Sequence, residues 1–380
     1  MILDYEVLKF IWWVLVGVLF IGFAVTDGLD MGVGALLPFL GKTDLERRVI
    51  INTVGPHWDG NQVWLITAGG AIFAAWPLVY ATAFSGFYFA MLLALFALFL
   101  RPVGFDYRSK IANPMWRSTW DWGLFVGGVV PALVFGIAFG NLLRGVPFHL
   151  DELLRPYYTG SFFGLLNPFA LIAGLISVGM LVLHGAIWLQ LRTAEPIAGR
   201  AKALAKPIGL ATIGAFAFAG LWLTIAGYGY QVINMPALDA VSNPLTKEVA
   251  AQRWGWLVNY WRYPLTLLFP ILGFAGLGGA IALSMRDRPG LGLVVSGLGI
   301  SGIILTAGSA MFPFIMASST NPNSSLLAWD VTSSHLTLTV MFWAAVIFIP
   351  IILGYTTWTY AKMWRRITVE EIKSQDTLAY

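Results

Sequence analysis

The sequence predicts an all-α integral membrane protein with about nine membrane-spanning helices. Of its 380 residues, 58% are hydrophobic and only 11% are charged, whereas soluble domains carry about 25% charged residues. Apolar runs of about twenty residues recur along the chain, which is the length that crosses the ~30 Å apolar slab of a bilayer. The 17 tryptophans and 13 tyrosines suit the aromatic belts at the two membrane interfaces.

The first apolar run follows Lys9 and is too long for the core of a signal peptide. No A-x-A cleavage site comes after it, so we interpret it as a retained membrane helix that ends in DGLDMGVG and is followed by a hydrophilic loop, KTDLERR. The second helix opens with Pro56 and His57. We expect a single polytopic domain over 1–380, with helices near 10–26, 57–77, 79–100, 120–140, 163–188, 207–228, 263–284, 291–313 and 335–360.

The distribution of positive charge predicts the orientation. With the N-terminus outside (periplasmic) and the C-terminus cytoplasmic, 17 of the 23 lysines and arginines fall on inner segments. Cytoplasmic loops carry such an excess in membrane proteins. The pI of about 9.2 therefore reflects membrane topology and gives no indication of a nucleic-acid partner.

The absence of cysteine from the sequence excludes disulfides, iron–sulfur clusters and covalently attached c-type haem. A redox cofactor bound here would need His or Met ligands, or no protein ligand. His184 and His335 lie near predicted membrane interfaces. A lone interfacial histidine is more often a hydrogen-bonded packing residue, so we expect no metal or haem ligated directly by this chain.

An ionisable cluster marks the predicted inner face. Asp27 and Asp30 lie one turn apart at the end of the first helix, His57 and Asp59 open the second, and Asp106 follows the third. Charged groups are costly in a membrane, and carboxylates beside a histidine are what a proton-uptake path needs. The cluster therefore predicts proton transfer.

Simpler readings remain open for single residues. An aspartate in the first turn of a helix, such as Asp59, is stabilised by the helix dipole. Asp106 could pair with Arg101 or Arg108. Trp64, like the other tryptophans, could serve as an interfacial anchor.

Several phrases together carry a family resemblance. FAVTDGLDMGVG, PHWDGNQVWLITAGGAIFAAWP, RPVGFDYRSK, FGIAFGNLLRGVPF and TAGSAMFPF resemble subunit II of the cytochrome bd ubiquinol oxidases, and the similarity spans nearly the whole chain. It implies a multi-pass subunit of the bacterial inner membrane. The complex would oxidise quinol near the outer face, reduce O2 to water with cytoplasmic protons and so generate a proton-motive force.

The resemblance also implies partners and cofactors. Subunit I would bind two b-type haems and one d-type haem, while subunit II is a similarly folded partner that holds a structural quinone in some members. The sequence leaves open which quinone is used and whether small accessory subunits join. Carried over by motif, the proton-transfer residues would be Asp59 and Asp106, supported by Asp27, Asp30 and His57, and Trp64 would lie near the oxygen entrance.

Two other functions are alternatives. A proton-coupled secondary transporter would hold its acids near the membrane midplane between broken helices, whereas here they gather toward one face. A b-type cytochrome would bind haem in this chain itself.

Overall fold

The computed structural model describes residues 3–374, so the extreme ends of the predicted 1–380 domain lie outside the described residues. Within that range, eight helices are long and apolar enough to cross a membrane. They are α1 (Tyr5–Leu40), α5 (Tyr88–Tyr107), α6 (Pro114–Arg144), α8 (Pro168–Arg192), α9 (Ile197–Ala226), α11 (Leu268–Met285), α12 (Pro289–Met311) and α13 (His335–Lys362). The predicted helical membrane fold is confirmed, and the orientation of its ends stays a prediction.

Shorter elements join these spans. The remaining helices are α2 (Asp44–Asn52), α3 (Trp58–Ala75), α4 (Pro77–Gly86), α7 (Phe162–Leu165), α10 (Gly255–Arg262) and α14 (Val369–Ser374). Short 3₁₀ turns are η1 (Arg108–Lys110), η2 (Pro244–Thr246), η3 (Pro264–Leu267) and η4 (Pro322–Ser324). Antiparallel pairs join β1 (Phe148–Leu150) to β2 (Pro156–Tyr158), β3 (Tyr230–Asn234) to β4 (Glu248–Ala251) and β5 (Phe314–Met316) to β6 (Leu326–Leu327).

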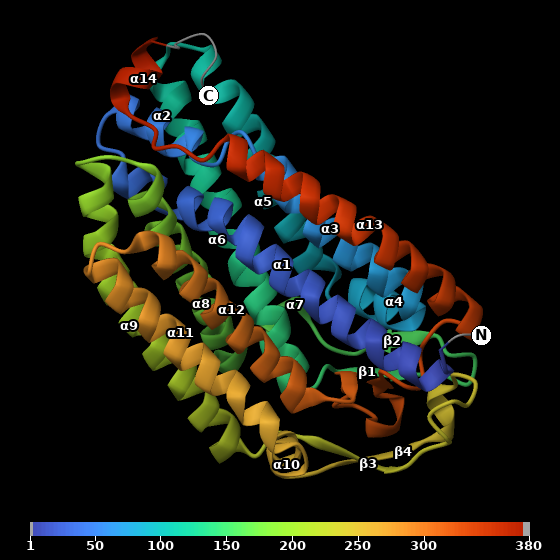
Figure 1. Ribbon diagram of the computed structural model, residues 1–380. Helices are drawn as coiled ribbons and strands as arrows, with labels where there is room; N and C mark the ends of the chain where they lie inside the picture. Colours follow the sequence, from blue (N-terminus) through green and yellow to red (C-terminus); the bar gives the residue numbers. More distant parts are fainter. Residues whose placement is uncertain (1–2, 375–380) are drawn as a thin grey trace.

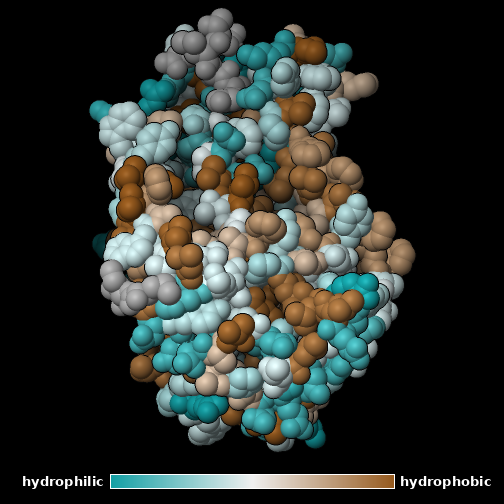
Figure 2. Space-filling model, turned by 90° about the vertical axis from the view of Figure 1, so that its right-hand side faces the viewer, coloured by the Kyte–Doolittle hydropathy of each residue, from teal (hydrophilic) through white to brown (hydrophobic). Residues whose placement is uncertain are grey.

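The molecule is an elongated bundle with α1 running through its middle (Figure 1). The strands β1 to β4 and α10 gather at one end, which we call the hairpin end, and α2 and α14 lie at the other, which we call the α2 end. Figure 2 shows the face where α13 and α4 lie, with hydrophobic side chains across its middle and hydrophilic ones toward its lower end. This banding matches an apolar slab between two wet interfaces.

The predicted boundaries differ from the structure most clearly in three places. The first helix continues through the DGLD phrase to Leu40, so both aspartates lie within a helix rather than at its end. The span expected at 57–77 forms α3, but it is not among the eight apolar helices because its first turn is polar. The span expected at 79–100 is instead divided at Phe87 into α4 and α5.

The loop expected after the first helix is helix α2. Thr43 caps it by accepting a hydrogen bond from the backbone N–H of Glu46, and the Glu46 side chain accepts one from the backbone of Thr43. This reciprocal capping box satisfies two backbone donors that the first helical turn leaves unpaired. The helix therefore begins at Asp44. The T-D-L-E sequence is typical of a helix start, but the high charge of the segment led to its interpretation as a loop.

Close backbone contacts fix α1 among its neighbours. At Gly32 of α1 an added Cβ would collide with the carbonyl oxygen of Leu181 in α8, and at Gly128 of α6 it would collide with the carbonyl oxygen of Met31. Small residues permit such approaches between membrane helices. The second half of α1 is consequently enclosed by α6 and α8, which places its two aspartates in the protein interior.

The hairpin end is tied to the start of α1 by Lys9, which is buried. Its Nζ donates hydrogen bonds to the carbonyl oxygens of Leu238, Ala240 and Trp329 at 3.0, 3.1 and 2.7 Å. A buried ammonium needs such partners because its desolvation is costly. The long loop between α9 and α10 is thereby held over the end of the bundle.

Candidate functional site

A buried ion pair joins two helices at the centre of the candidate site. Arg101 of α5 donates to both carboxylate oxygens of Asp27 of α1, Nη1 at 2.8 Å and Nη2 at 2.5 Å. Both side chains are almost fully buried, at 2% and 0% exposure. The two-pronged geometry is the strong form of an arginine–carboxylate contact, and it compensates charges that the apolar interior would otherwise exclude.

Asp30 extends this pair into a polar chain. Its Oδ2 accepts a hydrogen bond from Asn61 Nδ2 at 2.9 Å and lies 3.6 Å from Arg101 Nη2. Tyr360 of α13 donates to Asn61 Oδ1 at 2.8 Å. The Asp30 Oδ1 atom is buried without a hydrogen-bond partner among the described residues. An unpaired carboxylate oxygen is costly in such a place.

His57 lies beside the free oxygen of Asp30. Its Nδ1 is 3.9 Å from Asp30 Oδ1 and accepts from Asn61 Nδ2 at 3.1 Å, while Nε2 faces the Thr53 carbonyl oxygen at 3.1 Å. The carbonyl can only accept, so the geometry assigns the imidazole hydrogen to Nε2. The Asn61 amide thus links two titratable side chains, Asp30 and His57, in one hydrogen-bonded set.

Two of the five predicted acid–base residues lie apart from this set. Asp59 on α3 and Asp106 near the end of α5 are both exposed on the isolated chain. Among the described residues, Arg101 pairs with Asp27, and Arg108 pairs with Asp44 and Asp121. The simple pairing of Asp106 with either arginine is therefore not what the structure forms. A proton-transfer role for all five residues stays a prediction.

Trp64 is half-buried on α3 and packs across to α1. An added Cβ at Gly22 would lie only 2.6 Å from Trp64 Cε3, so the indole occupies the space that the glycine leaves. The predicted oxygen route past this residue stays a prediction.

Sequence reasoning missed three members of the network: Asn61, Arg101 and Tyr360. Arg101 was counted among the charges of an inner loop, whereas it lies within α5 and is 1% exposed. The sequence feature that could have indicated Arg101 is its position directly after an apolar run. An arginine inside a membrane helix is rare and usually functional. Tyr360 comes from the far end of the chain, and nothing in its local sequence indicates the contact.

Three histidines make hydrogen bonds within the bundle, and haem ligation outside this chain stays a prediction. His57 has both ring nitrogens in contacts, and His184 uses Nε2 on the Val25 carbonyl and Nδ1 on Ser296. His335 Nε2 binds the Leu3 carbonyl oxygen. Among residues 3–374, no group of three or more His, Asp or Glu side chains could hold a metal ion. His57 Nδ1 accepts a hydrogen bond from Asn61, which occupies the lone pair that an axial ligand would need.

The comparisons with known proteins agree with this description. The family model "Cytochrome bd terminal oxidase subunit II" matches residues 8–363. The chain is 58% identical over 371 residues to "Cytochrome bd-I ubiquinol oxidase subunit 2" of Escherichia coli (strain K12), covering 98% of both proteins. The chain belongs to the cytochrome bd oxidase subunit II family.

Two more distant proteins are also similar, one in sequence and one in fold. "Cytochrome bd ubiquinol oxidase subunit 2" of Bacillus subtilis is 32% identical, with 95% of this chain and 97% of that one covered. The solved bd oxidase of Geobacillus thermodenitrificans shares the fold at a TM-score of 0.67 and 14% identity, covering 92% and 97% of the two chains.

Family membership confirms several expectations. This bd oxidase subunit is a multi-pass protein of a bacterial membrane and part of an oxidoreductase complex, with subunit I as its implied partner and with haems carried by the complex. The transporter alternative is thereby set aside. The roles of individual side chains are not given by membership.

Proposed function

We propose that this chain is the non-haem subunit of a quinol:O2 oxidoreductase and that its buried acids carry protons from the cytoplasmic side. In this proposal the α2 end faces the cytoplasm, as the distribution of lysine and arginine predicts. Subunit I binds two b-type haems and one d-type haem, oxidises quinol near the outer face and reduces O2 to water. The occupied ring nitrogens of His57 and His184 support haem ligation in the partner.

The observation that carries the proton role is the buried set of Asp30, His57 and Asn61, with one carboxylate oxygen unpartnered. Asp59 and Asp106 are the entry groups in this scheme. They are exposed on α3 and α5 of the isolated chain, and an aspartate that faced lipid would be costly. This cost supports a position for both at the surface that subunit I covers.

Away from Asp59 and Asp106, the surface proposed to contact subunit I is apolar. Only 6% of the most apolar window of α13 is buried within this chain. Its exposed side chains include Trp343, Ile347 and Phe348. A helix that is apolar on its outer side is suited to lipid or to another membrane subunit. The two aspartates favour a protein partner over lipid for the part of this surface nearest the α2 end.

The test is proton-coupled turnover of the assembled complex carrying Asp59→Asn, Asp106→Asn or both. We expect slower O2 reduction, with the loss growing as pH rises, because protons become scarcer while the route is interrupted. Asp287→Asn is a matched control, since that carboxylate is 80% exposed and pairs with Lys202. Unchanged turnover and pH profile in the double variant, with the haems intact, would refute the proton route.

Trp64 is proposed to line oxygen access. Trp64→Phe should change the apparent O2 affinity of the complex, because it opens space against Gly22. Trp122→Phe, at a residue with 49% exposure, is the matched control. An O2 affinity that does not respond to side-chain size at position 64 would remove this part of the proposal. A structural quinone and small accessory subunits belong to the same proposal, and co-purification identifies them.

A further inference from the structure

A cationic cavity opens at the α2 end, away from the acid–histidine network. Its volume is about 220 Å³, well above the ~10–15 Å³ that a cavity needs to hold one water molecule. It lies between α2, η1 and the N-terminus of α6. The residues that line it, which define the arginine cavity, are Lys42, Asp44, Arg47, Arg108, Ala112, Pro114, Arg117 and Ser118.

The arginine cavity has more cations than its carboxylates neutralise. Four lysine or arginine side chains line it against the single carboxylate of Asp44. A second carboxylate, Asp121, lies behind the wall at 1% exposure and binds Arg108 Nε at 2.6 Å and Arg47 Nη1 at 2.7 Å. Asp44 binds Arg117 Nη1 at 2.5 Å. Two positive charges remain after these pairings, which favours an anionic ligand.

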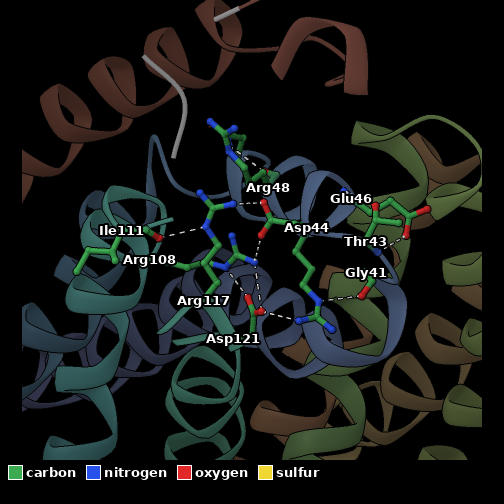
Figure 3. A network of polar contacts seen from close by, with 11 residues as sticks. Gly41, Thr43, Asp44, Glu46, Arg48, Arg108, Ile111, Arg117 and Asp121 are labelled. Atoms are coloured by element: carbon green, nitrogen blue, oxygen red, sulfur yellow. Dashed lines mark hydrogen bonds and ion pairs between the residues drawn. The ribbon is translucent and has the colours of Figure 1, made fainter. Parts of the chain in front are cut away.

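Arg108 supplies an independent sign of a missing ligand. Its side chain is 1% exposed, and Nε and Nη2 are used on Asp121 and Asp44. Its Nη1 has no hydrogen-bond partner in the described chain. Figure 3 shows the guanidinium groups of Arg108 and Arg117 converging beside Asp44. Leaving a buried guanidinium N–H unpaired is costly, and an acceptor oxygen within the cavity would remove that cost.

The flanking side chains distinguish between possible anions. Ile111 and Met115, which border the lining segment, are 47% and 78% exposed. The arginine cavity therefore sits where charged and apolar exposed surfaces meet, as at a membrane interface. A free phosphate would use only the cations. A phospholipid would place its phosphate against the guanidinium groups and its acyl chains along the apolar side chains.

We propose that the arginine cavity binds the phosphate of an anionic phospholipid of the inner leaflet. Arg108 Nη1 and the Arg117 guanidinium would donate to its oxygens, and Lys42 would add a mobile positive charge at the rim. Arginine forks suit phosphate because two parallel N–H groups match two of its oxygens. The site is separate from the proton network, and only its assignment to the inner leaflet rests on the proposed function, which places the α2 end on the cytoplasmic side.

The test is native mass spectrometry of the purified complex after delipidation, with phosphatidylglycerol, phosphatidylethanolamine or inorganic phosphate added at equal concentration. Wild type should retain one phosphatidylglycerol with clear preference over the zwitterionic lipid. Lys42→Gln with Arg117→Gln should weaken that binding about tenfold or more, because each removed contact is a charge-assisted hydrogen bond. Arg108 is left unchanged, since its buried pair with Asp121 supports the fold.

Lys206→Gln is the matched control, because Lys206 is exposed on α9 and does not line the arginine cavity. It should bind the lipid as wild type does, and all variants should keep wild-type haem content. Equal retention by wild type and the double variant would overturn the proposal. Retention of inorganic phosphate without lipid preference would also overturn it, in favour of a free-phosphate site.

Discussion

Removing Arg101 tests whether the Asp27 ion pair holds the bundle together. Arg101→Gln deletes both charge-assisted hydrogen bonds to Asp27, at 2.8 and 2.5 Å, and the contact to Asp30 at 3.6 Å. Two carboxylates with 0% exposure are then left without their cation. Breaking a buried pair from one side costs about 3–5 kcal/mol. At roughly 2 °C per kcal/mol for a large domain, the melting temperature should fall by about 6–10 °C.

The assay heats membranes containing the complex, solubilises them, and measures the fraction of assembled complex by size-exclusion chromatography with haem absorbance. Arg155→Gln is the control, because its pair with Asp151 is just as short at 2.7 Å but its side chain is 64% exposed. Water screens such a pair, so little change is expected. Asp27→Asn combined with Arg101→Gln should recover part of the loss. If Arg101→Gln melts within about 2 °C of the control, the pair does not stabilise the bundle as argued.

Two further changes probe packing and charge. Gly32→Ala should lower the free energy of unfolding by about 1–3 kcal/mol, as overpacking does, because the new Cβ meets the Leu181 carbonyl oxygen. Gly69→Ala is the control and should leave the melting temperature unchanged, because an added Cβ there has no atom within 4 Å. Equal melting temperatures of the two variants would contradict the packing argument. Burial raises the pKa of Glu46, but hydrogen bonds from Arg200 and two backbone amides outweigh this and hold it below its usual value of 4.5. The stabilisation by the Glu46 carboxylate is therefore present above pH 4.5 and is lost as pH falls through the lowered pKa. Glu46→Gln should reduce the melting temperature at pH 7, and the melting temperatures of variant and wild type should converge in acid. A difference in melting temperature that stays constant across pH would refute this.

Much of the helical layout could be predicted because lipid imposes it. A span must be apolar over about twenty residues, and this signal indicated seven of the eight crossing helices closely, whereas the span expected at 79–100 overlaps only the first part of the crossing helix that begins at Tyr88. Boundaries were less predictable, since polar side chains can continue a helix inside protein. Asp27 and Asp30 suggested the end of a helix by their charge, yet the helix continues to Leu40, with Arg101 paired to Asp27 and Asn61 donating to Asp30 inside the bundle.

The candidate site was only partly visible in the sequence for a related reason. The i, i+3 spacing of Asp27 and Asp30 places them on one helical face, but it does not identify a cation 74 residues away. Tyr360 lies 299 residues from the Asn61 that it contacts. Such pairings depend on how helices are arranged around one another, which local patterns of hydrophobicity do not specify.

The backbone contacts at Gly32 and Gly128 also restrict how charge could travel through the subunit. Helices that touch carbonyl against Cα cannot slide or rock past one another without a steric clash. The aspartates of α1 consequently keep fixed positions relative to α6 and α8. Any proton that passes them must hop between stationary donors, acceptors and water, so the rate would be set by the reorientation of side chains and solvent instead of by the swing of a domain.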